Sequence, residues 1–186
     1  MIQIALAGYT LALGERLPDG DDPDCSHAAL EERFDVAASP GRRHASTPNE
    51  LHVQVRHHTV WPQWPFLCVA LCYDREGGGA PGVLLVPETG LLFIGAGERL
   101  LAYHLHGPAR LWEDHADTGF HAWQRHDDLV VMAAELGLAA WDVRGVKRWS
   151  TFVEPPWSYQ VNGSTVRLDV MGRLSSFSLE SGPARP

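Results

Sequence analysis

A short pattern that recurs through the second half of the chain constrains the fold more than any other feature. In each copy, an aromatic residue is followed two positions later by an aliphatic residue and then, at short range, by a glycine. The aromatic residues lie 38 and 36 residues apart. The three copies are Tyr103-x-Leu105-x-Gly107, Trp141-x-Val143-x-Gly145 and Phe177-x-Leu179-x-x-Gly182. This period of about 37 residues indicates one supersecondary unit, copied so that each copy buries its face on its neighbours.

The pieces of each unit have the length and pattern of strands. Apolar runs at 91–94, 129–132 and 166–170 open the units, and Asn162-Gly163 is a strong signal for a two-residue hairpin turn. Residues 51–55 alternate between apolar and polar side chains, as a half-buried strand does. A helix over 128–136 is the open alternative, because Ala, Glu and Leu favour it. Together these patterns predict an all-β fold of short antiparallel strands in propeller-blade-like repeats.

The first fifty residues differ in texture from the rest. Residues 1–13 can supply one or two strands, and 14–50 is polar and rich in Gly and Pro. Within it, Ser26 can cap a short helix over 27–34, which carries acidic residues in its early turns. We interpret 1–50 as an N-terminal strand plus a polar excursion and 51–186 as the repeat-containing β core, within one domain over 1–186.

The segment Ala139-Ala140-Trp141-Asp142-Val143-Arg144-Gly145-Val146-Lys147-Arg148-Trp149 resembles the blade signature of PQQ-like (quinoprotein-type) β-propellers, and of WD-type propellers more broadly. The resemblance extends from residue 83 to the C-terminus, about half of the chain, and implies four-stranded antiparallel blades around a centre. The aspartate of the signature occurs only at Asp142, with His104 and Ser178 in the equivalent places. Three or four units are too few for a complete catalytic quinoprotein.

Composition excludes several classes of protein. Hydrophobic residues make up 45% of the chain, too many for a disordered protein, and the formal charge of −8 disfavours nucleic-acid binding. There is neither a signal peptide nor an apolar run of about 18 residues, so we expect no membrane insertion and a cytoplasmic location. Fourteen arginines against the single Lys147 are typical of a GC-rich bacterial genome. No dinucleotide or P-loop fingerprint is present, and we expect no cofactor.

The three cysteines are Cys25, Cys68 and Cys72. An odd number in a domain of this size does not suggest a disulfide scaffold. We therefore expect reduced thiols that pack as small hydrophobic side chains, in a reducing compartment.

Ten histidines suggest a metal site as one alternative. His104 and His106 would share a face of a strand, and His115 and Glu113 follow closely. Two imidazoles and a carboxylate can bind zinc or iron. Solvent-facing histidines on a strand are the simpler interpretation.

Two segments rich in aromatic residues and proline are the candidate binding residues. The first contains Trp61 and Trp64, and the second contains Glu154, Trp157 and Tyr159. Proline restricts such loops in advance, and exposed Trp and Tyr dominate binding hot spots. The indoles can instead plug the ends of the core, and this alternative stays open.

The favoured function is a non-catalytic binding or interaction protein of a bacterial cytoplasm, with a protein as its partner. Propeller-like scaffolds present loops at a rim, and the chain lacks a complete catalytic motif. The alternative function is a metal-dependent enzyme built on His104, His106 and a nearby carboxylate.

Overall fold

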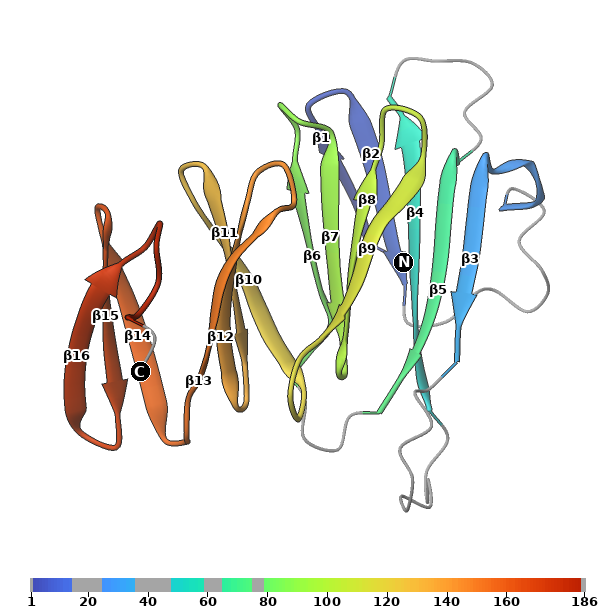
Figure 1. The fold of residues 1–186 in the computed structure, drawn as a ribbon. Helices are drawn as coiled ribbons and strands as arrows, with labels where there is room; N and C mark the ends of the chain where they lie inside the picture. The colour runs from blue at the N-terminus through green and yellow to red at the C-terminus, as the bar shows by residue number, and fades with distance from the viewer. Residues whose placement is uncertain (1, 15–24, 36–47, 59–64, 75–78, 185–186) are drawn as a thin grey trace.

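The fold is that of a computed structural model, which describes residues 2–14, 25–35, 48–58, 65–74 and 79–184 of the chain. Four β-sheets stand side by side in a row, from the N-terminal sheet at one end to the C-terminal sheet at the other (Figure 1). We call them sheets A, B, C and D in chain order. A cluster of buried hydrophobic side chains lies between each pair of neighbours. The prediction of an all-β fold built from blade-like repeats is confirmed.

Sheets B and C each consist of four antiparallel strands in chain order, and sheet D has three. Sheet B contains β6 (Gly82–Val86), β7 (Leu91–Ala96), β8 (Arg99–His104) and β9 (Ala109–His115). Sheet C contains β10 (Phe120–His126), β11 (Leu129–Ala134), β12 (Gly137–Asp142) and β13 (Lys147–Phe152). Sheet D contains β14 (Trp157–Asn162), β15 (Thr165–Val170) and β16 (Arg173–Ser178). Residues 129–134 form a strand, so the alternative of a helix over 128–136 is wrong.

The sequence repeat is a repeat of structure. Tyr103, Trp141 and Phe177 occupy the same place, the next-to-last residue of the third strand in sheets B, C and D. The pairing between the third and fourth strands also shifts register at this place in both four-stranded sheets, between Ala102 and Tyr103 and between Ala140 and Trp141. Because Tyr103 packs in the A–B cluster and Trp141 in the B–C cluster, each aromatic side chain fills the space toward the preceding sheet.

A tryptophan on the fourth strand fastens each four-stranded sheet to the next one. Trp112 on β9 donates from Nε1 to the carbonyl oxygen of Gly145 at 2.7 Å, in the turn between β12 and β13. Trp149 on β13 donates in the same way to the carbonyl oxygen of Leu179 at 2.7 Å, just after β16. These contacts explain why Trp112 and Trp149 recur at the period of the repeat.

Sheet A departs from the pattern of the other sheets. It contains β1 (Ile2–Leu6), β2 (Tyr9–Gly14), β3 (Leu30–Phe34), β4 (Asn49–His57) and β5 (Leu67–Tyr73), in the order β1-β2-β4-β5-β3. All of its pairs are antiparallel except β3 with β5, which is parallel.

The short helix predicted over 27–34 is wrong. The structure has one 3-10 turn, η1 (Cys25–His27), followed by strand β3. Tertiary contacts override the helical preference of the acidic residues, because the side chains of Glu32 and Phe34 on β3 have partners in sheet B. The Tyr103 hydroxyl donates to Glu32 at 2.6 Å, and the Arg99 guanidinium lies over the Phe34 ring at 4.9 Å.

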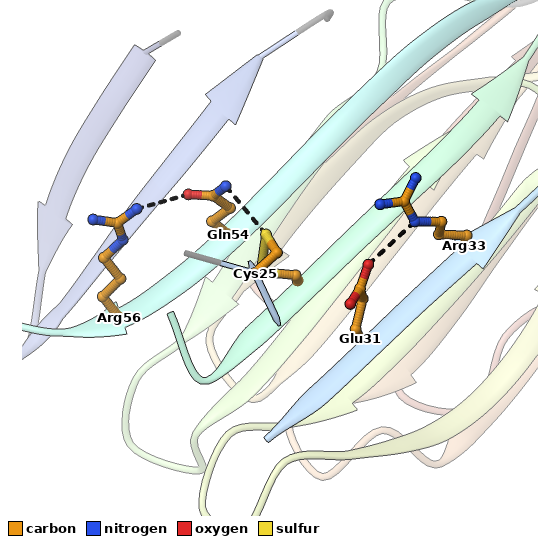
Figure 2. The surroundings of a disulfide bond; sticks show 6 residues. Cys25, Glu31, Arg33, Gln54 and Arg56 are labelled. Carbon is orange, nitrogen blue, oxygen red and sulfur yellow. Dashed lines mark hydrogen bonds and ion pairs between the residues drawn. A yellow bond between two sulfur atoms is a disulfide. The ribbon is translucent and has the colours of Figure 1, made fainter. Parts of the chain in front are cut away.

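Cys25 and Cys68 form a disulfide, so the expectation of three reduced thiols is wrong for these two residues. Parallel pairing places the start of β3 beside the start of β5, which brings Cys25 to Cys68 across 43 residues of sequence. Gln54 on β4 donates to the Cys25 sulfur at 3.4 Å and accepts from Arg56 at 2.9 Å (Figure 2). Cys72 is a free thiol. Since disulfides persist in oxidising environments, the cysteines no longer support a reducing compartment.

Candidate functional site

The turns of sheets B, C and D lie at the two ends of their strands, which we call the upper and lower ends as they lie in Figure 1. At the upper end, the Thr89 hydroxyl in the β6–β7 turn donates to the carbonyl oxygen of Val143, after β12, at 2.7 Å. At the lower end, the backbone N–H of Phe120 donates to Gly97, after β7, at 2.6 Å. Functional side chains can therefore be assigned to one end or the other.

A groove of about 500 Å³ lies between sheets C and D at the upper end. Sheet C contributes residues 126–129 around the β10–β11 turn, the end of β12 and one residue of β13. Sheet D contributes the β14–β15 turn and the segment after β16. The lining residues are His126, Asp127, Asp128, Leu129, Asp142, Arg148, Gly163, Ser164, Leu179 and Glu180. We call this hollow the C–D groove.

Backbone turns fix the polar walls of the C–D groove. Asp142 follows the repeat aromatic, and its Oδ1 accepts from the backbone N–H groups of Arg144 and Val146, both at 2.9 Å. On the opposite wall, the N–H of Leu179 donates to the carbonyl oxygen of Ser164 at 2.8 Å and ties the two turns of sheet D together. Arg148 and Glu180 approach each other across the groove at 3.7 Å.

The C–D groove has a strongly acidic lining. Asp127, Asp128, Asp142 and Glu180 contribute four carboxylates against the single guanidinium of Arg148. Burial lowers the pKa of His126, with Asp127 acting weakly in the opposite direction, so the imidazole is neutral near pH 7. Its Nε2 atom is buried without a hydrogen-bond partner. Such a lining attracts cationic groups and repels anions.

The residues of the metal alternative do not converge. His104 pairs with Ala109 and His115 with Arg99, so the two imidazoles lie at opposite ends of the β8–β9 hairpin. Five residue steps along a strand separate them by about 17 Å. Glu113 is held by Arg99 at 3.1 Å and by Arg110 at 3.3 Å. Within the described residues, no group of three His, Cys, Asp or Glu side chains is placed to hold a metal ion.

His106 lies apart from the other residues of that set, in the turn after β8 at the upper end. Its Nδ1 is 3.4 Å from the hydroxyl of Tyr9, and its ring packs 6.3 Å from the Tyr9 ring. The residue therefore contacts sheet A, and its exposed imidazole lies beside Gly90 at the rim of the A–B core.

Trp157 and Tyr159 lie on β14 and pack between sheets C and D. Their rings stack at a centroid distance of 6.2 Å, and Trp157 Nε1 donates to the carbonyl oxygen of Glu135 at 2.9 Å. Glu154 is exposed in the segment that leads to β14 at the lower end. Trp61 and Trp64 lie outside the described residues. The last described residue before them is His58, whose backbone N–H donates to the carbonyl oxygen of Gly8 at 2.7 Å. A binding role for these five aromatic and acidic residues stays a prediction.

The packing of Tyr159 predicts alkaline destabilisation. Burial raises the pKa of Tyr159 to about 12, and its hydroxyl donates to Gln124 at 2.9 Å. A raised pKa means that stability is fully present below the unfolded value near 10 and is lost as pH rises toward 12. We expect about 1 kcal/mol to be lost between about pH 9 and pH 11 through this residue, after allowance for its partial exposure. Urea unfolding of Tyr159→Phe across that range should show a correspondingly shallower pH dependence, and an unchanged slope would contradict the assignment.

Sequence reasoning did not identify the C–D groove. Its lining comes from five short stretches between residues 126 and 180, which meet only when sheets C and D pack. Two signals were present separately. Asp142 stood out as the polar residue after the repeat aromatic, and Asn162-Gly163 predicted the β14–β15 hairpin that supplies one wall.

The chain matches no protein-family model and no curated protein sequence. Among solved structures it is similar to Hsv2 of Kluyveromyces lactis, with a TM-score of 0.32 at 11% identity over 55% of this chain. A form of that protein in which loop 6CD is replaced by a Gly-Ser linker gives a TM-score of 0.31 at 11% identity over 54% of this chain. The chain spans about a third of those proteins, 34% of each. Likeness at this level says nothing about function.

None of the described residues forms a helix that is long and apolar enough to cross a lipid bilayer.

Proposed function

We propose that the chain is a non-catalytic binding protein and that its C–D groove receives a basic segment of a protein partner. The observation that carries this proposal is the hollow itself, about 500 Å³ with four carboxylates and one guanidinium in its lining. The volume falls within the range of about 300–1,000 Å³ that is usual for binding pockets, which is ample for one or two long side chains.

The chemistry of the walls fits Lys or Arg side chains. Leu129 and Leu179 provide apolar surface against which the methylene stem of a long cationic side chain can pack. The carboxylates of Asp127, Asp128 and Glu180 can then accept hydrogen bonds from the charged head. An acidic chain with a formal charge of −8 would also attract a basic partner from a distance.

Other parts of the functional prediction rest on the sequence. The bacterial source is a prediction from the excess of arginine over lysine, and the cytoplasmic location likewise stays a prediction from the sequence. The Cys25–Cys68 disulfide removes one support for that location. A metal-dependent reaction at His104, His106, Glu113 and His115 is disfavoured by the separation of His104 from His115.

The test compares two triple variants of equal charge. One is Asp127→Asn/Asp128→Asn/Glu180→Gln, in the groove, and the other is Glu31→Gln/Asp35→Asn/Asp117→Asn, at exposed acids elsewhere. Fluorescence anisotropy measures the binding of labelled hexalysine at low salt. We expect the groove variant to weaken binding by about tenfold and the control variant to leave it within about twofold, since three exposed charge pairs at about 0.5 kcal/mol each together contribute about 1.5 kcal/mol, close to a factor of ten.

The equal charge of the two variants separates a localised site from general attraction. Equal losses in both variants would show that hexalysine reads only the net charge of the molecule, and would overturn the groove as a site. Raised salt should weaken binding to the wild-type protein, because the contacts are electrostatic.

A further inference from the structure

Strand β1 leaves apolar side chains in solvent at the free edge of sheet A. Among the described strands it pairs only with β2, with Ile2 opposite Leu13, Ile4 opposite Leu11 and Leu6 opposite Tyr9. Opposed residues of an antiparallel pair point to the same face, so the three side chains belong to the face that packs on sheet B. The Tyr9 and Leu11 side chains are 5% exposed, whereas Ile2, Ile4 and Leu6 are 67%, 47% and 46% exposed.

The edge of β1 also lacks the features that normally discourage strand pairing. Charged residues, prolines and bulges protect most edge strands from other chains. The other edge of sheet A, β3, carries Glu31, Glu32 and Arg33. By contrast, β1 reads Ile-Gln-Ile-Ala-Leu, has no charged side chain and pairs with β2 without a register shift.

We propose that a second copy of this chain covers β1 by antiparallel pairing of β1 with β1. A two-fold axis at Ile4 would place Ile4 opposite its counterpart and Ile2 opposite Leu6 of the second copy. The pairing is self-complementary, as an isologous interface requires. It would join the two A sheets into one continuous sheet and extend the A–B core surface of Tyr9 and Leu11 across the junction.

Charge favours β1 over the rest of the surface as the place where two copies can meet. Each chain carries a formal charge of −8, which opposes self-association over most of the surface. A strand of five uncharged residues is a place where two such chains can meet without apposed like charges. One strand pair with six apolar side chains buries less than the roughly 1,200 Å² of a stable standard interface, so we expect a weak, reversible dimer.

Sedimentation equilibrium over about 1 µM to about 1 mM measures this association. We expect a monomer–dimer equilibrium for the wild-type protein and at least a tenfold weaker association for Ile4→Lys, because the substitution apposes two cations at the axis. Leu174→Lys is the matched control, since Leu174 is 66% exposed on β16 and lies far from β1 along the row. A wild-type monomer throughout this range, or equal effects of the two lysines, would overturn the proposal.

A cross-linking variant provides a positive readout that does not depend on loss of folding. Opposed residues of an antiparallel pair lie about 4.5–5.5 Å apart between Cα atoms, within the range that a disulfide spans. In a Cys72→Ser background, Ile4→Cys should give a covalent dimer on mild oxidation and Leu174→Cys should not. Absence of the covalent dimer from folded Ile4→Cys protein at a concentration of about 1 mM would contradict pairing at Ile4.

Discussion

Replacing Gly182 with alanine is expected to lower the free energy of unfolding by about 3 kcal/mol, a large effect for the addition of one methyl group. Gly182 follows β16 with a φ of +74°, and a Cβ there would overlap Cγ and Cβ of Trp149. Trp149 is only 8% exposed, and its Nε1 is committed to the carbonyl oxygen of Leu179, so the indole has no free direction in which to move.

Gly145→Ala is expected to behave in the same way at the preceding junction. Gly145 has a φ of +82°, and a Cβ there would meet Leu111 at 2.5 Å and Leu91 at 3.0 Å. Its carbonyl oxygen accepts the bond from Trp112, so a shift of the turn also lengthens that bond. The third glycine of the repeat, Gly107, is the matched control. Its φ is +80°, but a Cβ there would have nothing within 4 Å.

The difference between these variants isolates close packing from backbone strain. Gly107→Ala should cost about 1 kcal/mol, the usual penalty of a left-handed conformation for a residue with a Cβ. Urea unfolding at constant pH gives the three values. If Gly107→Ala were as costly as the other two substitutions, then backbone conformation, and not close packing against the neighbouring sheet, would explain the repeated glycine.

The repeat made the fold of residues 79–184 predictable because each of its members has a physical role. The aromatic side chains of Tyr103, Trp141 and Phe177 fill the space toward the preceding sheet. The glycines at 145 and 182 lack a side chain and so leave room for side chains of that sheet. The same contact is repeated at each junction between sheets. The residues that make it therefore recur at a regular spacing in the sequence. The pairing of four strands in chain order then follows from short connections between antiparallel neighbours.

Sheet A was not predictable in the same way, since its contacts are made once. Strand β3 carries three charged residues in succession, which suit a helix. Its Glu32 and Phe34 find partners in Tyr103, Arg99 and Arg110 of sheet B, which are distant in sequence. The C–D groove escaped prediction for a related reason. Its carboxylates come from separate turns, and none of these turns carries a binding motif.

Sheet D differs from sheets B and C in the side chains on its outer face. Register places Phe93, Val131 and Arg167 at equivalent positions of the second strand. Phe93 and Val131 are fully buried against the following sheet, whereas Arg167 is exposed. On the third strand, the buried Leu100 and Leu138 correspond to Leu174, which is 66% exposed. The outer face of sheet D therefore lies in solvent in this structure.

Breaking the Cys25–Cys68 disulfide is expected to have the largest effect of any change considered, about 4 kcal/mol of unfolding free energy in the chain-entropy model. The two cysteines are 43 residues apart, and the cross-link restricts the unfolded chain over that whole length. In the folded protein the bond holds η1 against the outer face of sheet A, where Gln54 is only 2% exposed and donates to Cys25. Loss of the disulfide would also loosen η1, which shields the side-chain amide of Gln54 from solvent.

Urea unfolding with and without a thiol reductant measures the effect, and a Cys25→Ala/Cys68→Ala variant reproduces it without reductant. That variant should respond to reductant by less than about 0.5 kcal/mol, as should any protein that has no disulfide left to reduce. Cys72→Ala in the wild-type background is the companion control, because Cys72 is a free thiol on the same strand. It should retain the full response to reductant. An unchanged midpoint on reduction of the wild-type protein would mean that β3 is held by its contacts with Tyr103 and Arg110 alone, and that the cross-link contributes nothing to the stability of sheet A.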